Sequence, residues 1–408
     1  MAPAKQSKPN VFGRKILWVT PMLYFLPHRS SLIDVLRHLT MRRHSIVLIT
    51  NWPRNLVVEK TPKMNKISFP LRYVPLISPF MFAIAMCFFL PAYIIASKPD
   101  FIVIEPDITI LSGILGRFVS IFRKTKFVLD IRSIPVETVG FRGFQKKLWF
   151  NASVLTAKKL FDGITIITPL MKKEVCSKFD IDPSKVGVWT SGVSIELFDP
   201  ENCISDGKEL KRKLGLARKF VVFYHGFFSF GRGLTETIEA MKIVRRKHTN
   251  VVFFLLGTGF NVDMLSVLIR KENLQENVII HNPVDQSEVP KFIGMCDICI
   301  VPLPDNPFWR FQSPLKLLEY LAMEKVVILT DIPAHRAVVG KAKCGIYISA
   351  AKPMEIAKAI EYCYFNKENL EEWGAVGRRI VTEEYTWKKV AGDLENYLIS
   401  IDDKADLI

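Results

Sequence analysis

The chain has 408 residues, too many for one ordinary core and enough for two domains. Its 49% apolar and 24% charged residues exclude a largely disordered protein. The net charge is +16, and residues 1–200 hold most of the excess, with 28 Lys and Arg against 13 Asp and Glu. This imbalance predicts an anionic partner for the first half. Without an aromatic–basic nucleic-acid motif in the sequence, we expect anionic lipid at a membrane surface and no nucleic acid.

The cysteines and the N-terminal sequence indicate where in the cell the protein is expected. Seven cysteines, an odd and scattered set, argue against a disulfide framework and for a reducing compartment. Residues 16–26 resemble the core of a signal peptide, but no small-residue cleavage site follows and the same run is typical of a first strand. We therefore expect the protein at the cytoplasmic face of a membrane.

The first half alternates apolar runs with amphipathic segments. Runs typical of buried parallel strands lie at 15–20, 45–50, 101–105, 126–131 and 163–168. Segments with the helical spacing of apolar residues lie at 31–41, 109–122 and 148–160. This alternation predicts a doubly wound parallel sheet.

An uncharged stretch at 73–97 interrupts this series. It is long and apolar enough to span a bilayer, although three prolines fall within it. The strands expected before and after it belong to one sheet, and a spanning helix would separate them. A helix embedded in one leaflet is favoured; a buried core helix and a true span remain as alternatives.

A second alternating series follows an interruption at 193–202, where Asp199, Pro200 and Asn202 indicate a linker. Strands are expected at 220–224, 251–256, 278–281, 298–302 and 326–330, and helices at 234–246, 263–271, 287–295, 314–323 and 353–365. The two series predict an α/β protein of two Rossmann-like domains facing across a cleft, with ligands beyond the carboxyl ends of the strands.

The strongest candidate for a binding site is a predicted helix start. Ser313 is a favoured N-cap residue, and Pro314 suits the first helical position. The free N–H groups there, including that of Leu315, predict a pyrophosphate site to which Lys316 adds a positive charge. Glu319 follows where a carboxylate can accept both hydroxyls of a ribose. An ordinary surface helix with a capping serine is the alternative.

Two further signals converge on this segment. Gly257 and Gly259 directly follow an apolar strand, where glycine permits a tight turn and close approach of a ligand to the backbone. Arg232 opens the helix after the strand at 220–224, and a guanidinium there can clamp a diphosphate through two hydrogen bonds. A solvated loop charge is the alternative for Arg232.

Over nearly its whole length, the chain resembles the family 4 retaining glycosyltransferases of GT-B fold. The run from Pro314 to Ala322 resembles the family pattern Pro-x-Lys-x-x-Glu-Tyr-x-Ala, and Gly257-Thr-Gly259 resembles its Gly-x-Gly loop. Arg232 stands where the family has Lys or Arg before Gly. Residues 383–391 resemble the segment that begins a C-terminal helix, which in this fold crosses back onto the first domain.

The resemblance implies an acceptor-binding, membrane-facing domain over 1–195, a nucleotide-sugar domain over 196–385 and a returning helix over 386–408. It also implies hexosyl transfer with retention at the anomeric carbon, with Glu319 holding the ribose of the nucleotide. Leaving-group chemistry assigns Arg232, Lys316 and the helix start to the departing diphosphate. If these groups supply the charge, no metal or further cofactor is required.

The acceptor side is assigned to the first domain. His28, Asp130 and Arg132 are its candidates, with a local ion pair at a strand end as the alternative for Asp130 and Arg132. Residues 141–150 mix basic and aromatic side chains, which suits docking to an anionic leaflet. We therefore expect a lipid-linked or glycan acceptor at the membrane surface.

Several positions depart from the family pattern. Phe311 stands where many members carry the first of two glutamates, Phe227 replaces an arginine, and Ser133 replaces an aspartate. These departures motivate an alternative function, a catalytically degenerate GT-B protein that acts as a binding or scaffold subunit.

Overall fold

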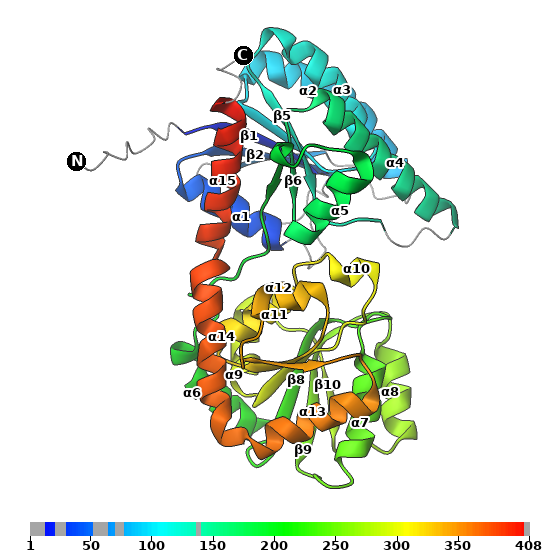
Figure 1. Ribbon diagram of the computed structural model, residues 1–408, viewed down its shortest axis with the longest axis vertical. Helices are drawn as coiled ribbons and strands as arrows, with labels where there is room; N and C mark the ends of the chain where they lie inside the picture. Colours follow the sequence, from blue (N-terminus) through cyan, green and yellow to red (C-terminus); the bar gives the residue numbers. More distant parts are fainter. Residues whose placement is uncertain (1–12, 21–29, 52–63, 70–76, 136–139, 404–408) are drawn as a thin grey trace, which may run out of the picture. The chain divides into compact units, whose positions relative to one another are not determined.

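The computed structural model describes residues 13–20, 30–51, 64–69, 77–135 and 140–403, and these form two compact units. The described residues up to Trp189, together with those from Val390 onward, make the first unit, and Thr190–Lys389 makes the second. Each unit has a parallel sheet of its own, covered by helices (Figure 1).

The first unit contains a parallel sheet whose seven described strands follow the order β3-β2-β1-β4-β5-β6-β7. Their bounds are β1 Lys15–Thr20, β2 Ser45–Asn51, β3 Met64–Phe69, β4 Phe101–Ile104, β5 Lys126–Ile131, β6 Gly163–Ile166 and β7 Val186–Val188. The strand order reverses between β1 and β4. The carboxyl ends of these strands therefore form the switch point at which doubly wound sheets bind ligands.

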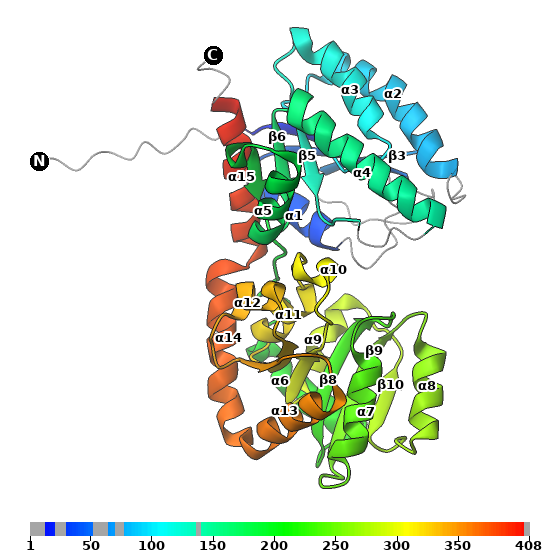
Figure 2. The same cartoon turned by 45° about the vertical axis from the view of Figure 1, so that its right-hand side comes forward.

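Helices α2, α3 and α4 of the first unit lie side by side (Figure 2). The described helices and 3₁₀ turns are α1 Ser30–Met41, α2 Ile77–Ser97, α3 Ile110–Val119, η2 Ser120–Phe122, α4 Gly140–Leu160, α5 Pro169–Phe179, η3 Pro183–Lys185 and α15 Trp387–Asp403. Helices α2 and α3 approach closely at Gly116, where an added Cβ would lie 3.1 Å from Cδ1 of Ile94 and 3.2 Å from Cδ2 of Leu90.

Helix α15 fixes the C-terminal segment onto the first unit. The buried carboxylate of Glu395 lies 2.8 Å from Nε2 of His44, and the backbone N–H of Arg14 donates to Nδ1 of the same ring. His44 therefore carries its proton on Nε2 and donates it to Glu395. Tyr397 occupies the space above Gly187, where an added Cβ would lie 2.3 Å from Cγ of the ring. The helix returns to the first unit, as the sequence predicts.

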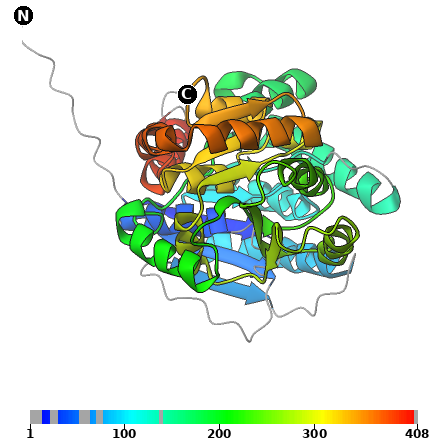
Figure 3. The same cartoon turned by 90° about the horizontal axis from the view of Figure 1, so that it is seen from below.

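The second unit contains a parallel sheet with six described strands in the order β10-β9-β8-β11-β12-β13. Their bounds are β8 Phe220–Phe227, β9 Val251–Thr258, β10 Val278–His281, β11 Ile298–Val301, β12 Val326–Thr330 and β13 Gly345–Ile348. Successive side chains of β8 enter separate cores, because Phe223 packs in one and Tyr224 in the other. Helices lie on both sides of these strands (Figure 3). The two sheets confirm the predicted pair of Rossmann-like domains.

The predicted linker at 193–202 is wrong in its second half. Pro200 is the first residue of α6, and the carboxylate of Asp199 caps the helix by accepting a hydrogen bond from the N–H of Glu201 at 3.3 Å. Asp-Pro is ambiguous in sequence, since it suits both a turn and a helix start. The helices and 3₁₀ turns of this unit are α6 Pro200–Lys213, α7 Leu234–Val244, α8 Val262–Lys271, η4 Gln286–Glu288, α9 Val289–Gly294, α10 Pro307–Arg310, α11 Leu315–Ala322, α12 Pro333–Val339, α13 Pro353–Phe365, η5 Lys367–Asn369 and α14 Leu370–Glu384.

Some elements of the first unit are absent from the sequence prediction. Strand β3 (MNKISF) lies at the edge of its sheet and contains Asn65 and Lys66, so it lacks the continuous apolar run of a central strand. Helix α4 begins at Gly140 rather than at Leu148, because its first turns mix basic and aromatic residues without a clear apolar stripe.

Candidate active site

The residues predicted to bind a nucleotide sugar meet where strand β8 and helix α11 pack together. Nζ of Lys316 lies 3.6 Å from the ring centroid of Tyr224, which belongs to β8. One turn further along α11, Oε2 of Glu319 lies 3.0 Å from Nε2 of His225, the next residue of the same strand. The packing of α11 on the sheet thus brings a cation and a carboxylate to the carboxyl end of β8.

Lys316 is a buried cation without a hydrogen-bond partner. Its ammonium is shielded from solvent, and among the described residues no atom accepts a hydrogen bond from Nζ. Loss of hydration lowers the pKa of this ammonium well below 10.5, the nearby Arg232 lowers it further, and Glu319 acts in the opposite direction. A buried and unsatisfied ammonium is costly unless an anion accompanies it. The site is therefore arranged to receive a negative group.

Arg232 is the second cation of the site. It lies between Gly231 and Gly233, which adopt φ values of 69° and 72°. Its Nε donates to Oγ of Ser229 at 2.9 Å, and its guanidinium carbon lies 4.9 Å from the ring centroid of Trp309. These contacts fix the guanidinium close enough to depress the pKa of Lys316. Two neighbouring cations of this kind suit a diphosphate.

Glu319 is held in a half-buried position beside the sheet, its side chain 13% exposed. Nε2 of His225 lies within contact distance of the carboxylate, and the backbone N–H of His225 donates to the hydroxyl of Tyr320 at 2.9 Å. The histidine is thereby tied to α11 at two successive residues. A carboxylate oriented in this way can accept hydrogen bonds from a pair of ligand hydroxyls.

Gly257 and Gly259 are required by the close contact between the carboxyl ends of β8 and β9 and the residues that follow them. A Cβ at Gly257, whose φ is 148°, would lie 2.0 Å from the carbonyl oxygen of Gly226. A Cβ at Gly259 would lie 2.1 Å from the carbonyl oxygen of Phe228. At these two glycines the structure brings backbone close to backbone, and the approach of a ligand there stays a prediction. This contact supports the site indirectly, because an added Cβ at Gly226 would also lie 3.3 Å from Nζ of Lys316.

The prediction that Ser313 caps helix α11 is wrong. The helix begins at Leu315, and Pro314 takes the cap position with ψ of 105°. The hydroxyl of Ser313 instead accepts a hydrogen bond from the N–H of Ser191 at 3.2 Å, and its carbonyl accepts one from the hydroxyl of Ser191 at 3.0 Å. This long-range pairing competes successfully with local capping, and it fixes the segment that leads into α11.

Asp130 and Arg132, the candidates for the acceptor side, meet at the end of β5 in the first unit. Oδ1 of Asp130 accepts hydrogen bonds from Oγ1 of Thr165 at 2.7 Å and from Nε1 of Trp189 at 2.9 Å. Arg132 stacks on Trp189 at 3.4 Å and donates to its carbonyl oxygen at 2.7 Å. His28, the third candidate, lies outside the described residues. Asp130 and Arg132 thus lie in one local cluster, in which Oδ2 of Asp130 is buried without a hydrogen-bond partner among the described residues, and their role on the acceptor side stays a prediction.

We expect Asp130→Asn to remove a pH-dependent loss of stability. Burial raises the pKa of Asp130 to about 6 from an ordinary value of 3.8. The folded protein therefore keeps this proton when the unfolded chain has lost it, and the free energy of unfolding falls as the pH rises between those values. The expected fall is about 2–3 kcal/mol.

Urea denaturation of the first unit across that pH range measures this effect. Asparagine keeps an acceptor for Thr165 and Trp189 but does not titrate, so the contribution of Asp130 to the slope should disappear, and the difference in free energy of unfolding between the variant and the wild type should change with pH by that amount. Asp180→Asn, which alters an exposed carboxylate of the same unit, should keep the pH dependence of the wild type. An unchanged slope in Asp130→Asn would contradict the assignment.

The described residues contain no group of three or more His, Cys, Asp or Glu side chains arranged to hold a metal ion. Asp180 and Asp182 have Asp-x-Asp spacing but serve other contacts. Asp180 pairs with Lys158 at 3.0 Å, and Asp182 accepts from the N–H of Ser184 at 2.8 Å.

Three residues of the site were not predicted from the sequence. Tyr224 supports Lys316, His225 contacts Glu319, and Trp309 stacks on Arg232 while its Nε1 donates to the carbonyl of Gly231 at 3.0 Å. The position of Tyr224 and His225 at the carboxyl end of a predicted strand is the one signal that pointed to them.

The second unit resembles a known protein family. Residues 206–380 match the family model of glycosyl transferases group 1. The Bacillus subtilis protein TuaH, named as a teichuronic acid biosynthesis glycosyltransferase, is 26% identical over 191 residues, which cover 47% of this chain and 45% of TuaH. Across this and two further curated relatives, the chain spans between 45% and 63% of their length.

Solved structures match the whole fold. A glycosyltransferase from Rickettsia africae superposes with a TM-score of 0.76 at 15% identity, covering 95% of this chain and 98% of the other. Anabaena HepE in complex with UDP superposes with a TM-score of 0.75 at 16% identity, covering 95% and 100%. The family match lies within the second unit, and the two parallel α/β sheets match the GT-B fold of these solved structures.

Proposed function

We propose that the protein is a glycosyltransferase that uses a nucleotide-diphosphate sugar. The observation that carries this proposal is the pair of neighbouring cations, Lys316 and Arg232, in which a shielded ammonium has no hydrogen-bond partner among the described residues. Departure of a nucleoside diphosphate places negative charge on the leaving group. Fixed cations directed at that charge stabilise the transition state more than the ground state.

The remaining side chains have roles consistent with this chemistry. Glu319 accepts the ribose hydroxyls of the donor, and His225 holds its carboxylate in place. The two cations supply the positive charge, so the proposed reaction needs no metal. Resemblance to family 4 supports retention at the anomeric carbon, with the leaving phosphate assisting deprotonation of the acceptor.

The donor and acceptor are proposed at the level of chemical class. UDP in the HepE structure supports a UDP-sugar as the first donor to test. The name of TuaH refers to teichuronic acid biosynthesis, and this supports a glycan or lipid-linked acceptor. We place the reaction at the cytoplasmic face of a membrane, where the basic first half of the chain meets anionic lipid.

A donor panel tests the function. Purified protein is offered UDP-, GDP- and ADP-sugars, and release of nucleoside diphosphate is followed with and without membrane lipid extract. We expect release from one donor that depends on the extract and falls at least about tenfold in Glu319→Ala, because lost hydrogen bonds to substrate hydroxyls cost on the order of 1–3 kcal/mol. Glu276→Ala, an exposed change in the same unit, is the control. Nucleotide binding without release from any donor would favour a degenerate scaffold protein.

A further inference from the structure

Helix α2 is apolar on every side and yet largely uncovered. It is the one helix of the described residues long and apolar enough to cross a membrane, and 28% of its most apolar stretch is buried. One face packs inward through Phe82, Met86, Leu90 and Ile94. The opposite face exposes large apolar side chains at helical spacing, namely Ile77, Phe80, Met81, Ile84, Phe88 and Ile95. A helix at a water-facing surface carries polar residues on its outer face.

Helix α3 and the turn η2 extend this surface. They pack beside α2 and expose Leu111, Leu115, Phe118 and Ile121, again at helical spacing. These residues and the six of α2 are named here the apolar face. Contiguous exposed apolar surface of this kind marks a contact with another hydrophobic body.

The charge around the apolar face has one sign. Helices α2, α3 and α4, with η2, contain six Lys and Arg and no Asp or Glu. Arg123 and Lys124 follow η2 directly, and Lys98 follows α2; all three are exposed. Arg123 makes no ion pair with any described residue. An apolar surface bordered mainly by basic residues complements an anionic bilayer, since acyl chains and phosphate headgroups meet at matching depths.

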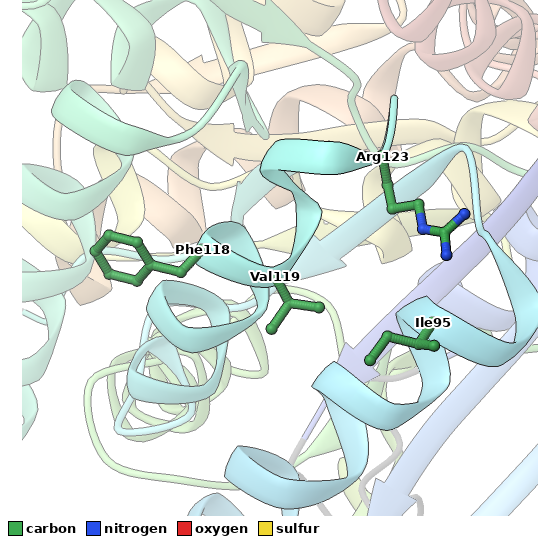
Figure 4. A pocket seen from close by; sticks show the side chains of 4 residues that line it. All are labelled: Ile95, Phe118, Val119 and Arg123. Atoms are coloured by element: carbon green, nitrogen blue, oxygen red, sulfur yellow. The ribbon is translucent and has the colours of Figure 1, made fainter.

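A hollow at the end of the apolar face combines both features. It is an open depression of about 500 Å³, lined by Ile95, Phe118, Val119 and Arg123. The Arg123 side chain extends from the end of η2 toward α2, with its guanidinium beside Ile95 (Figure 4). Apolar walls next to a guanidinium fit a phospholipid, with its acyl chain against the walls and its headgroup phosphate at the guanidinium.

The sheet topology limits how deeply α2 can enter a membrane. Along the chain, strand β3 precedes α2 and strand β4 follows it. Both strands lie in the same parallel sheet. A helix that crossed the bilayer would leave these strands on opposite sides of it. The helix can therefore enter from one side with its outer face alone.

We propose that the apolar face embeds in a single leaflet of an anionic bilayer, with Arg123 binding a phospholipid phosphate at the hollow. This gives the proposed membrane location a defined surface in the first unit, separate from the donor site on α11. The inference holds independently of the transfer reaction, so its test and the donor panel succeed or fail separately.

Flotation with vesicles tests the proposal. We expect the full-length protein to float with mixed phosphatidylcholine–phosphatidylglycerol vesicles. The double variant Ile84→Ser/Phe88→Ser should bind at least about tenfold more weakly, because two large side chains no longer enter the acyl region. These side chains are 54% and 77% exposed, so the fold should tolerate the change. Met354→Ser, which alters a side chain 53% exposed in the second unit, should leave binding unchanged.

A charge reversal separates the headgroup contribution from the apolar one. Arg123→Glu should weaken binding to the anionic vesicles by about tenfold and reduce their advantage over pure phosphatidylcholine. Arg218→Glu, at an exposed arginine of the second unit, should leave binding to the anionic vesicles unchanged. UDP binding, measured in each variant by thermal shift, reports that the second unit is intact.

Two results would overturn the proposal. Equal flotation of the wild type and the double variant would show that the apolar face does not touch lipid. Self-association that the double variant abolishes, in a wild type that does not float, would assign the face to a second copy of the chain.

Discussion

Lys316→Met is expected to lower kcat/KM by about a thousandfold without destabilising the free protein. The ammonium of Lys316 is shielded and lacks a hydrogen-bond partner among the described residues, so the folded protein gains little from its charge. Methionine has a similar unbranched shape and no charge to desolvate. The departing diphosphate would lose one of two fixed cations, a loss on the order of 10²–10³ in rate.

The stability measurement distinguishes a catalytic cation from a structural one. Because the folded pKa of Lys316 is lowered, the unfolded chain binds more protons in the interval between that value and 10.5. The free energy of unfolding of the wild type should therefore rise with pH in that interval, and the rise should be absent in the variant. Lys208→Met, at an exposed lysine of the same unit, should change neither activity nor stability.

Either of two outcomes would contradict this account of Lys316. Full activity in Lys316→Met would mean that the leaving group does not depend on the ammonium. A marked fall in the free energy of unfolding would mean that the ammonium supports the fold through its contact with Tyr224.

Gly257→Ala is expected to destabilise the second unit by about 3 kcal/mol or more, and to raise the KM for the donor. The added methyl would lie 2.0 Å from the carbonyl oxygen of Gly226, a backbone atom that cannot rotate away, and φ of 148° is unfavourable for alanine. Displacing Gly226 would also disturb Lys316, whose ammonium lies above it.

Gly215→Ala is the matched control for this change. Gly215 also has a positive φ, of 70°, but an added Cβ there has no atom within 4 Å. Its cost should be that of backbone conformation alone, about 1–2 kcal/mol. Denaturant titration of both variants measures the difference. Equal costs would show that the contact between β8 and β9 at these glycines relaxes freely.

The sequence was sufficient for the architecture because parallel strands buried on both faces leave an unmistakable pattern. Central strands such as β4 (FIVI) and β11 (ICIV) are uniformly apolar, and their alternation with helical segments allows few other folds. The edge strand β3 lacks this pattern, since one side of an edge strand has no neighbour to exclude water. The start of α6 was hidden because Asp-Pro is favoured in turns and at helix starts alike.

Residue type and spacing also singled out Arg232, Lys316 and Glu319, because phosphate and ribose recognition requires particular charged groups near particular strand ends. Tertiary structure decided how these groups are held. The ring of Tyr224 beneath Lys316, the contact of His225 with Glu319 and the pairing of Ser313 with Ser191 join positions distant in sequence, so local propensity carries no signal of them.

The outer face of α2 is the clearest case in which the sequence alone does not determine the surroundings of a residue. A run of apolar residues reads alike whether a helix is buried, spans a bilayer or lies at its surface, because hydrophobicity along the chain does not say what surrounds each side. The sequence by itself determined that α2 carries no charge. Only the packing against α3, and the placement of β3 and β4 in one sheet, left Phe88 and its neighbours facing outward.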